Sequence, residues 1–185
     1  MEINQFLVDK DMQGLKCPKE MKPSYITIHN TNNNVSAEFN VKHMRLSHSP
    51  VSYHYAVGAD IWQGIEDTRT AYHCGDGAFG KGNNNSIGIE ICYSTDYKTD
   101  KFDKAFNLAA KLVAFLMLKH DIPLENVVQH NYWSGEDCPK RIRAEGTWDD
   151  FIDLVKKEVK NEQRKIQASS AGTRRTGNSR KKVRS

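Results

Sequence analysis

The chain has 185 residues, of which 38% are hydrophobic and 27% charged, and this length and composition favour one soluble domain with room for an appendage. No apolar run reaches the roughly 18 residues that a membrane-spanning helix needs, and the N-terminus does not resemble a secretory signal peptide, so synthesis in a cytoplasm is expected. The net charge of +4 conceals a division, because eight Lys or Arg and no acid lie between Arg164 and Ser185, which leaves 19 bases against 23 acids elsewhere.

The first part of the chain predicts a strand, a helix and a hairpin. Residues Tyr25–Ile28 form a β-rich run that ends at an Asn-rich turn. Ser36 can cap a helix over Ala37–Leu46. The aromatic and β-branched run Ser52–Val57 is separated from Ile61–Ile65 by a short Gly/Asp turn, which predicts a β-hairpin.

The middle of the chain predicts a loop, a strand and the clearest helix. Residues Gly75–Asn85 are rich in Gly and Asn, which is typical of a loop. Ser86–Cys92 then reads as an apolar strand with one acid in it. Over Lys101–Lys119, apolar residues recur at steps of three and four, which predicts a helix with one buried face. Asp100 can cap its start.

The last part of the chain predicts a short strand at Val127–Val128 and an amphipathic helix at Trp148–Val159. Residues 168–173 have the composition of a linker. The alternation of strands and helices indicates an α/β fold with a central mixed sheet flanked by helices. We expect a single domain over residues 1–161, followed by a basic, disordered linker or tail at 162–185.

The four cysteines are Cys17, Cys74, Cys92 and Cys138, and they contain no Cys-x-x-Cys pair. A zinc ribbon or a thioredoxin-like site is therefore not expected. Cytoplasmic synthesis argues against a disulfide framework. Three of the four are interpreted as small buried hydrophobic residues, and Cys138 is set apart by its position.

Three residues are candidates for a metal site. His29 and His130 each end a predicted strand, and Cys138 follows in a turn-rich loop. Catalytic zinc usually takes three protein ligands and a water, and a mixed His/His/Cys set suits zinc. Spacing alone leaves the alternative open, because seven His and four Cys offer many such triples and a strand-end His is often a hydrogen-bonded structural residue.

Four segments in order carry a resemblance to a known family. They are Tyr25–Thr31, Ser52–Val57, Asn85–Ile91 and Val127–Pro139, within a span of roughly Tyr25 to Trp148. This series resembles the zinc amidase family that includes bacteriophage endolysins and peptidoglycan recognition proteins. The likeness is greatest to endolysins of phages that infect spore-forming Gram-positive bacteria, and it implies the α/β fold of that family.

The resemblance implies N-acetylmuramoyl-L-alanine amidase activity, which hydrolyses the amide between muramic acid and the first L-alanine of the peptidoglycan stem peptide. It implies one zinc ion held by His29, His130 and Cys138. Such a zinc polarises the scissile carbonyl and lowers the pKa of a water. Glu90 matches the acid that serves many members as general base.

Glu90 and Tyr53 are the candidate catalytic side chains, each with an open alternative. Strand alternation places Glu90 on the face opposite the neighbouring isoleucines, where it is a base, a solvated acid or half of an ion pair. Tyr53 matches a tyrosine that can stabilise an oxyanion in relatives. Its alternative is a half-buried strand aromatic.

Three further residues, His73, Trp62 and Asn85, are candidates for lining a substrate groove, and structural roles are equally open for each. Other histidines have no motif and are expected at the surface: His43, His48 and His120.

One position departs from the family pattern. Two residues before the metal cysteine, relatives often carry a Lys or Thr that assists the oxyanion, and here that residue is Glu136. An ionised carboxylate cannot donate a hydrogen bond. Lys140 and Arg141 lie close by in sequence as substitutes, and Lys140 itself stands where the family usually has Gly.

Other functions stay open alongside the enzyme. Some relatives recognise peptidoglycan without cutting it, typically after loss of the metal cysteine, so Cys138 favours an enzyme. A bacterial autolysin or sporulation amidase is an alternative to a phage or prophage endolysin. The basic tail suits anionic wall polymers or nucleic acid, or serves as a linker to a wall-binding domain. Because the body has no basic helix or stacking platform, nucleic acid and membranes are not expected partners. We expect a monomer that acts on the wall after release from the host cytoplasm.

Overall fold

The computed structural model describes residues 1–179, and side chains as far as residue 168. At its centre is a six-stranded sheet with the order β1-β4-β3-β5-β2-β6. All neighbouring strands are parallel except the β3–β4 hairpin, so the predicted mixed sheet is confirmed. The strands are β1 (Asn4–Gln5), β2 (Tyr25–Asn30), β3 (Tyr55–Val57), β4 (Ile61–Gln63), β5 (Ser86–Ile91) and β6 (Val127–Gln129).

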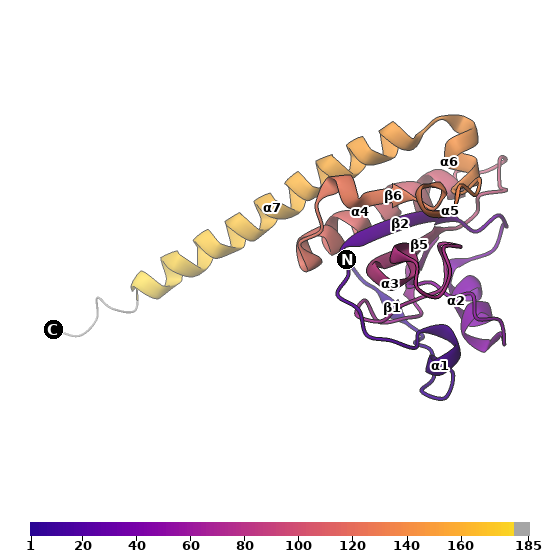
Figure 1. Ribbon diagram of the computed structural model, residues 1–185. Helices are drawn as coiled ribbons and strands as arrows, with labels where there is room; N and C mark the ends of the chain where they lie inside the picture. The colour runs from indigo at the N-terminus through magenta and orange to yellow at the C-terminus, as the bar shows by residue number, and fades with distance from the viewer. Residues whose placement is uncertain (180–185) are drawn as a thin grey trace.

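Helices cover both faces of the sheet. The two longest, α4 and α7, pack on each other on one side, and α2 and α3 lie on the other (Figure 1). None of the helices in the described part of the chain is long and apolar enough to span a bilayer. The helices are α1 (Gln13–Lys16), α2 (Ala37–Leu46), α3 (Lys81–Asn85), α4 (Lys101–His120), the 3₁₀ helix η1 (Leu124–Asn126), α5 (Asn131–Ser134), α6 (Lys140–Glu145) and α7 (Trp148–Ser179).

The alternation of side chains along β5 divides the core from the site. Ile87, Ile89 and Ile91 are fully buried and belong to the hydrophobic core. Gly88 and Glu90 point to the opposite face. The predicted helix over residues 101–119 is confirmed as α4, and it ends at Asp121, whose φ of 55° is left-handed. The sheet therefore has one apolar face and one face available for chemistry.

The two predicted helix caps have different outcomes. Ser36 Oγ accepts a hydrogen bond from the Phe39 N–H at 3.2 Å, so the predicted cap of α2 is confirmed. Asp100 occupies the N-cap position of α4 without capping the backbone. Its carboxylate instead lies 2.8 Å from Lys104 Nζ, an exposed pair one helical turn away.

The last helix is longer than the sequence pattern predicts. Helix α7 continues to Ser179, so the expected end at Val159 is wrong. Residues 168–173 are helical, and the assignment of residues 162–185 as a linker or tail after the domain at 1–161 stays a prediction. From Lys160 to Ala168 the residues are mostly Lys, Glu, Gln, Arg and Ala, which favour helix even where no apolar face is buried. Residues 169–179 contain no proline but are rich in Ser, Thr and Gly, so composition does not explain the last turns. The helix extends well beyond the body (Figure 1), and residues 180–185 of the basic tail lie outside the described residues.

Several short elements carried no sequence signal. Strand β1 adds to the edge of the sheet beside β4, and α3 lies inside the segment expected to be a loop. Helices α1, α5 and α6 span four to six residues each, too short for a periodic pattern. The predicted hairpin is confirmed, with strands shorter than expected at Tyr55–Val57 and Ile61–Gln63.

The interior holds one ionised network away from the cleft. Asp67 is buried and its carboxylate accepts hydrogen bonds from the Tyr55 hydroxyl, from Lys119 Nζ at 2.8 Å and from His120 Nε2 at 2.7 Å. Burial opposes ionisation of Asp67, but the hydrogen bonds outweigh it and hold the pKa of the carboxyl below its usual value. The expectation that His120 lies at the surface is therefore wrong, since it closes this network.

We expect Asp67→Asn to lower the free energy of unfolding by about 2 to 3 kcal/mol at pH 7, because it replaces a charged acceptor. A depressed pKa stabilises the fold above the unfolded value and loses that contribution as pH falls through the folded value. The difference in the free energy of unfolding between Asp67→Asn and wild type should thus become smaller below about pH 4. Urea unfolding at several pH values measures it. The control Asp153→Asn, in an exposed pair with Lys156, should change little, and an equal loss in both variants would contradict the expectation.

Candidate metal centre

Two neighbouring strands and one loop bring the three predicted ligands together. His29 is the fifth residue of β2, His130 follows β6, and Cys138 lies between α5 and α6. One ligand atom from each lies within 4.8 Å of the others. His29 Nδ1 and Cys138 Sγ are 3.7 Å apart, and the rings of His29 and His130 have centroids 4.7 Å apart. Because parallel strands end at the same edge of a sheet, this edge collects the ligands.

The donor set fits a tetrahedral divalent metal. Bond lengths of about 2.0 Å to nitrogen and 2.3 Å to sulfur place two tetrahedral ligands about 3.5 Å apart, close to the 3.7 Å between His29 Nδ1 and Cys138 Sγ. His130 Nε2 is buried and has no hydrogen-bond partner among the described residues. An orphaned buried nitrogen costs free energy unless something binds it, and a metal ion would do so.

The electrostatics of the ligands also suit a cation. Burial, reinforced by His73 and His130, holds the pKa of His29 well below its usual value, so its imidazole is neutral and offers a lone pair. Burial and the nearby Glu90 raise the pKa of the Cys138 thiol to about 12. A bound cation reverses that preference and stabilises the thiolate.

Glu90 lies beside the ligands, since it pairs in register with His29 on the adjacent strand. Glu90 is not half of an ion pair, because no Lys or Arg pairs with it within residues 1–168. It is not a fully solvated acid either, because its Oε2 is buried without a hydrogen bond. Burial, and then the charge of Glu136, raises the pKa of the Glu90 carboxyl to about 8. Such a carboxylate is suited to exchanging protons near neutral pH.

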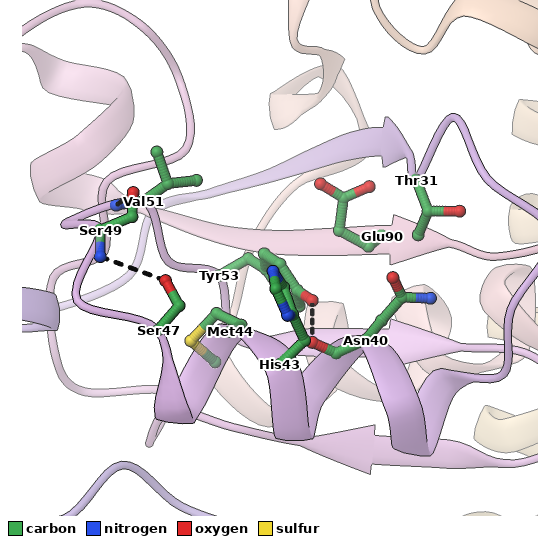
Figure 2. A pocket seen from close by; sticks show the side chains of 9 residues that line it. All are labelled: Thr31, Asn40, His43, Met44, Ser47, Ser49, Val51, Tyr53 and Glu90. Carbon is green, nitrogen blue, oxygen red and sulfur yellow. Dashed lines mark hydrogen bonds between the residues drawn. The ribbon is translucent and has the colours of Figure 1, made fainter.

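His130, Cys138 and Glu90 line a cleft of about 660 Å³, together with Tyr53 and His73. His29 lies behind them, only 2% exposed. A smaller cavity of about 220 Å³ adjoins the cleft along α2. Figure 2 shows Glu90 above this second cavity, with residues of α2 beneath it. Glu90, Tyr53 and Val51 line both spaces, so the cavities form one groove around the carboxylate.

Tyr53 lies in the groove, but its hydroxyl is already engaged. It donates to the carbonyl oxygen of Asn40 in α2 at 2.8 Å, a bond drawn in Figure 2. Burial and Glu90 raise the pKa of the Tyr53 phenol above its usual value. In this arrangement the hydroxyl anchors α2 to the sheet and is not directed at the metal ligands, which favours the structural alternative.

Comparison of the sequence with known proteins identifies the family of this chain. The sequence model described as "N-acetylmuramoyl-L-alanine amidase" (Amidase_2) matches residues 19–141. The chain belongs to this amidase family. It is 40% identical to CwlA of Bacillus subtilis strain 168 over 172 residues, which cover 92% of this chain and 63% of CwlA.

Other relatives support the same assignment. XlyB, an N-acetylmuramoyl-L-alanine amidase of B. subtilis strain 168, is 40% identical over 158 residues, covering 85% of this chain and 50% of XlyB. The solved structure of PlyL is 47% identical, with a TM-score of 0.81 over 84% of this chain and 97% of PlyL. The chain thus spans about half to three fifths of these curated relatives and nearly all of the PlyL structure.

Of the three residues predicted to line a groove, the structure places one in the cleft lining and two outside it. His73 lines the cleft but is only 7% exposed. Trp62 lies on β4 beside the sheet edge, where its Nε1 donates to Asp60, and it does not line the cleft. Asn85 ends α3 and is also absent from the lining, whereas Asn83 is present. Only the Asn-rich composition of this run pointed toward Asn83.

At the departure from the amidase-family pattern, Glu136, the two nearby basic residues lie in different settings. Arg141 is buried, and its guanidinium binds the Asp96 carbonyl and Glu145 at 2.8 Å each. Lys140 is exposed and lines a hollow with Glu136 and Cys138, both of which also line the cleft. Glu136 is exposed, with a carboxylate oxygen 3.7 Å from His130 Nε2. Its charge raises the pKa of Glu90 and does not assist an oxyanion.

Proposed function

We propose that this chain is a zinc-dependent N-acetylmuramoyl-L-alanine amidase that cleaves the bond between N-acetylmuramic acid and L-alanine of the stem peptide. The observation that carries the proposal is the cluster of His29, His130 and Cys138 beside the unpaired Glu90, with His130, Cys138 and Glu90 lining one cleft. Membership of the amidase family supports the choice of substrate.

In this proposal one set of residues binds the metal and a separate residue transfers protons. His29, His130 and Cys138 would hold the zinc, which when bound supplies polarisation of the scissile carbonyl and a lowered water pKa. Glu90 removes a proton from the attacking water and returns it to the leaving nitrogen. The buried setting of Glu90 strengthens its electrostatic interaction with charge that develops in the cleft.

The biological setting we propose is that of a phage or prophage endolysin, acting as a monomer on the cell wall after synthesis in the host cytoplasm. XlyB, the relative named as an N-acetylmuramoyl-L-alanine amidase of B. subtilis, supports a role at the cell wall. A bacterial autolysin is the neighbouring possibility within the same chemistry. Anionic wall polymers are the partners proposed for the basic segment from Arg164 onward, because it has eight Lys or Arg and no acid of its own and attracts anionic surfaces. Lys165 alone of these is paired, with Glu162, among the residues whose side chains the structure describes.

A wall-binding module without catalysis is the second candidate, favoured by the retention of a groove that would hold a peptide whether or not it is cut. The presence of both Cys138 and Glu90 favours the enzyme over this candidate. The two functions differ in whether new amino groups appear on walls that the protein has bound.

Removal of metal should abolish the activity reversibly. We expect full-length protein treated with a chelator to lose lysis of purified cell walls and release of free L-alanine amino groups, and one equivalent of zinc to restore both. Co-sedimentation with walls should persist without metal if the groove is intact. Sedimentation with no new amino groups under any metal condition would identify a binding module, and new reducing sugar ends instead would identify a different hydrolase.

A further inference from the structure

A histidine outside the ligand set is in direct contact with one of the ligands. His73 precedes α3 in the chain and is 7% exposed. Its Nδ1 lies 3.0 Å from His29 Nε2, and its Nε2 lies 3.2 Å from the carbonyl oxygen of Ser86. The three groups therefore form a line from the backbone of β5 to the face of His29 that is turned away from Cys138.

The chemistry of this line determines where each proton lies. A carbonyl oxygen only accepts, so His73 Nε2 carries the proton that reaches Ser86. Because the ring is buried and neutral, its Nδ1 then holds a lone pair. Two groups face this lone pair, His29 Nε2 at 3.0 Å and Cys74 Sγ at 3.2 Å. We take His29 Nε2 as the donor, since a thiol is the weaker donor of the two. With its own proton on Nε2, neutral His29 has a lone pair on Nδ1, the atom 3.7 Å from Cys138 Sγ.

The surrounding chain holds the His73 ring in this position. The backbone N–H of His73 donates to Asn83 Oδ1 at 2.8 Å. A Cβ at Gly88 would lie 2.7 Å from His73 Nδ1, closer than such atoms approach, so the ring packs on β5 only because residue 88 is glycine. Ser86 and Gly88 share one strand face, which places the acceptor and the gap together.

We propose that His73 is a positioning residue, which fixes the tautomer and ring orientation of His29 so that His29 Nδ1 is presented to the metal. This inference rests on the proposed metal site. His73 also lines the cleft, so its predicted contact with substrate stays a prediction beside this role. Partners of this kind typically contribute about 10- to 100-fold to metal affinity.

A competing arrangement uses the same residues. His29, His73 and Cys74 also have ligand atoms within 4.8 Å of one another. A metal there would need His29 Nε2 without its proton, with His29 shared between two ions. The positioning role and this second site differ in zinc stoichiometry and in the part played by Cys74.

Variants of the full chain separate the two arrangements. His73→Leu removes the acceptor, whereas His73→Asn keeps an oxygen near the place of Nδ1. Cys74→Ala tests the neighbouring thiol, because Cys74 is buried and its Sγ lies 3.2 Å from His73 Nδ1, the atom that also faces His29. Zinc affinity is measured by competition with a chromogenic chelator, stoichiometry by elemental analysis, and folding by thermal melting.

We expect one zinc per chain in wild type, affinity about 10- to 100-fold weaker in His73→Leu, and values near wild type in His73→Asn and Cys74→Ala. A folded His73→Leu with wild-type affinity would overturn the inference while leaving the amidase proposal standing. Two zinc ions per chain, one of them lost in Cys74→Ala, would do the same. A wild type that binds no zinc would remove both proposals.

Wild-type protein provides a second readout that needs no variant to fold. Long-range proton–nitrogen NMR spectra of the imidazoles distinguish the two neutral tautomers. We expect both His29 and His73 to carry the proton on Nε2, with and without zinc. A proton on His29 Nδ1 in the metal-free protein would overturn the inference.

Discussion

Cys138→Ser is expected to lose zinc and, with it, amidase activity by about 10³-fold or more, since a bound metal contributes several kcal/mol to the transition state. The serine hydroxyl does not ionise near neutral pH and is a poor ligand compared with a thiolate. The sulfur of Cys138 lies 3.7 Å from His29 Nδ1, so its loss leaves two histidines to hold the ion. Elemental analysis and release of L-alanine amino groups from purified walls measure the two effects.

Cys17→Ser is the matched control for this variant. Cys17 is also a free cysteine, and it is buried at the start of the chain outside the cleft. We expect this control to keep its zinc and its activity, with a cost confined to stability. If Cys138→Ser retained a full equivalent of zinc and wild-type activity, the ligand assignment would have to be abandoned.

Glu90→Gln should keep zinc and lose about 10²- to 10⁴-fold in kcat/KM, the usual contribution of a general base. Glu and Gln have nearly the same shape, so the fall in kcat/KM measures the loss of proton transfer and not a change in packing. A base must be ionised to act, and burial raises the pKa of the Glu90 carboxyl to about 8. A bound cation lowers that value. Wild-type kcat/KM should therefore rise with pH through the pKa of Glu90, and this limb should be absent from the variant.

Glu136→Gln is the control for charge near the cleft. Glu136 is exposed and raises the pKa of Glu90 from a distance. Its removal should move the acidic limb of the pH profile to lower pH and leave the maximum rate within a few-fold. Full activity in Glu90→Gln, or loss of zinc from it, would contradict the role of Glu90 as base.

Local patterns in the sequence determined the larger elements and the sheet. Apolar residues at steps of three and four marked α4, and the Ser36 cap marked α2, because both signals are local in the chain. The order of the four resembling segments pointed to the family and to the metal ligands. The long extension of α7 was missed because an exposed helix has no apolar face to detect.

Only the tertiary structure decided which predicted groups meet in the cleft. The Tyr53 hydroxyl bonds to α2, and Trp62 lies on β4, between β1 and β3 in the sheet and outside the cleft lining. The place of a strand in the sheet depends on its pairing with segments distant in the chain. Likewise, His73 can contact and orient His29 only because the carbonyl oxygen of Ser86 and the glycine at position 88 hold its ring. Spacing along the chain identified candidate ligands, whereas hydrogen-bond direction and burial, which are properties of packing, determined what each side chain can do.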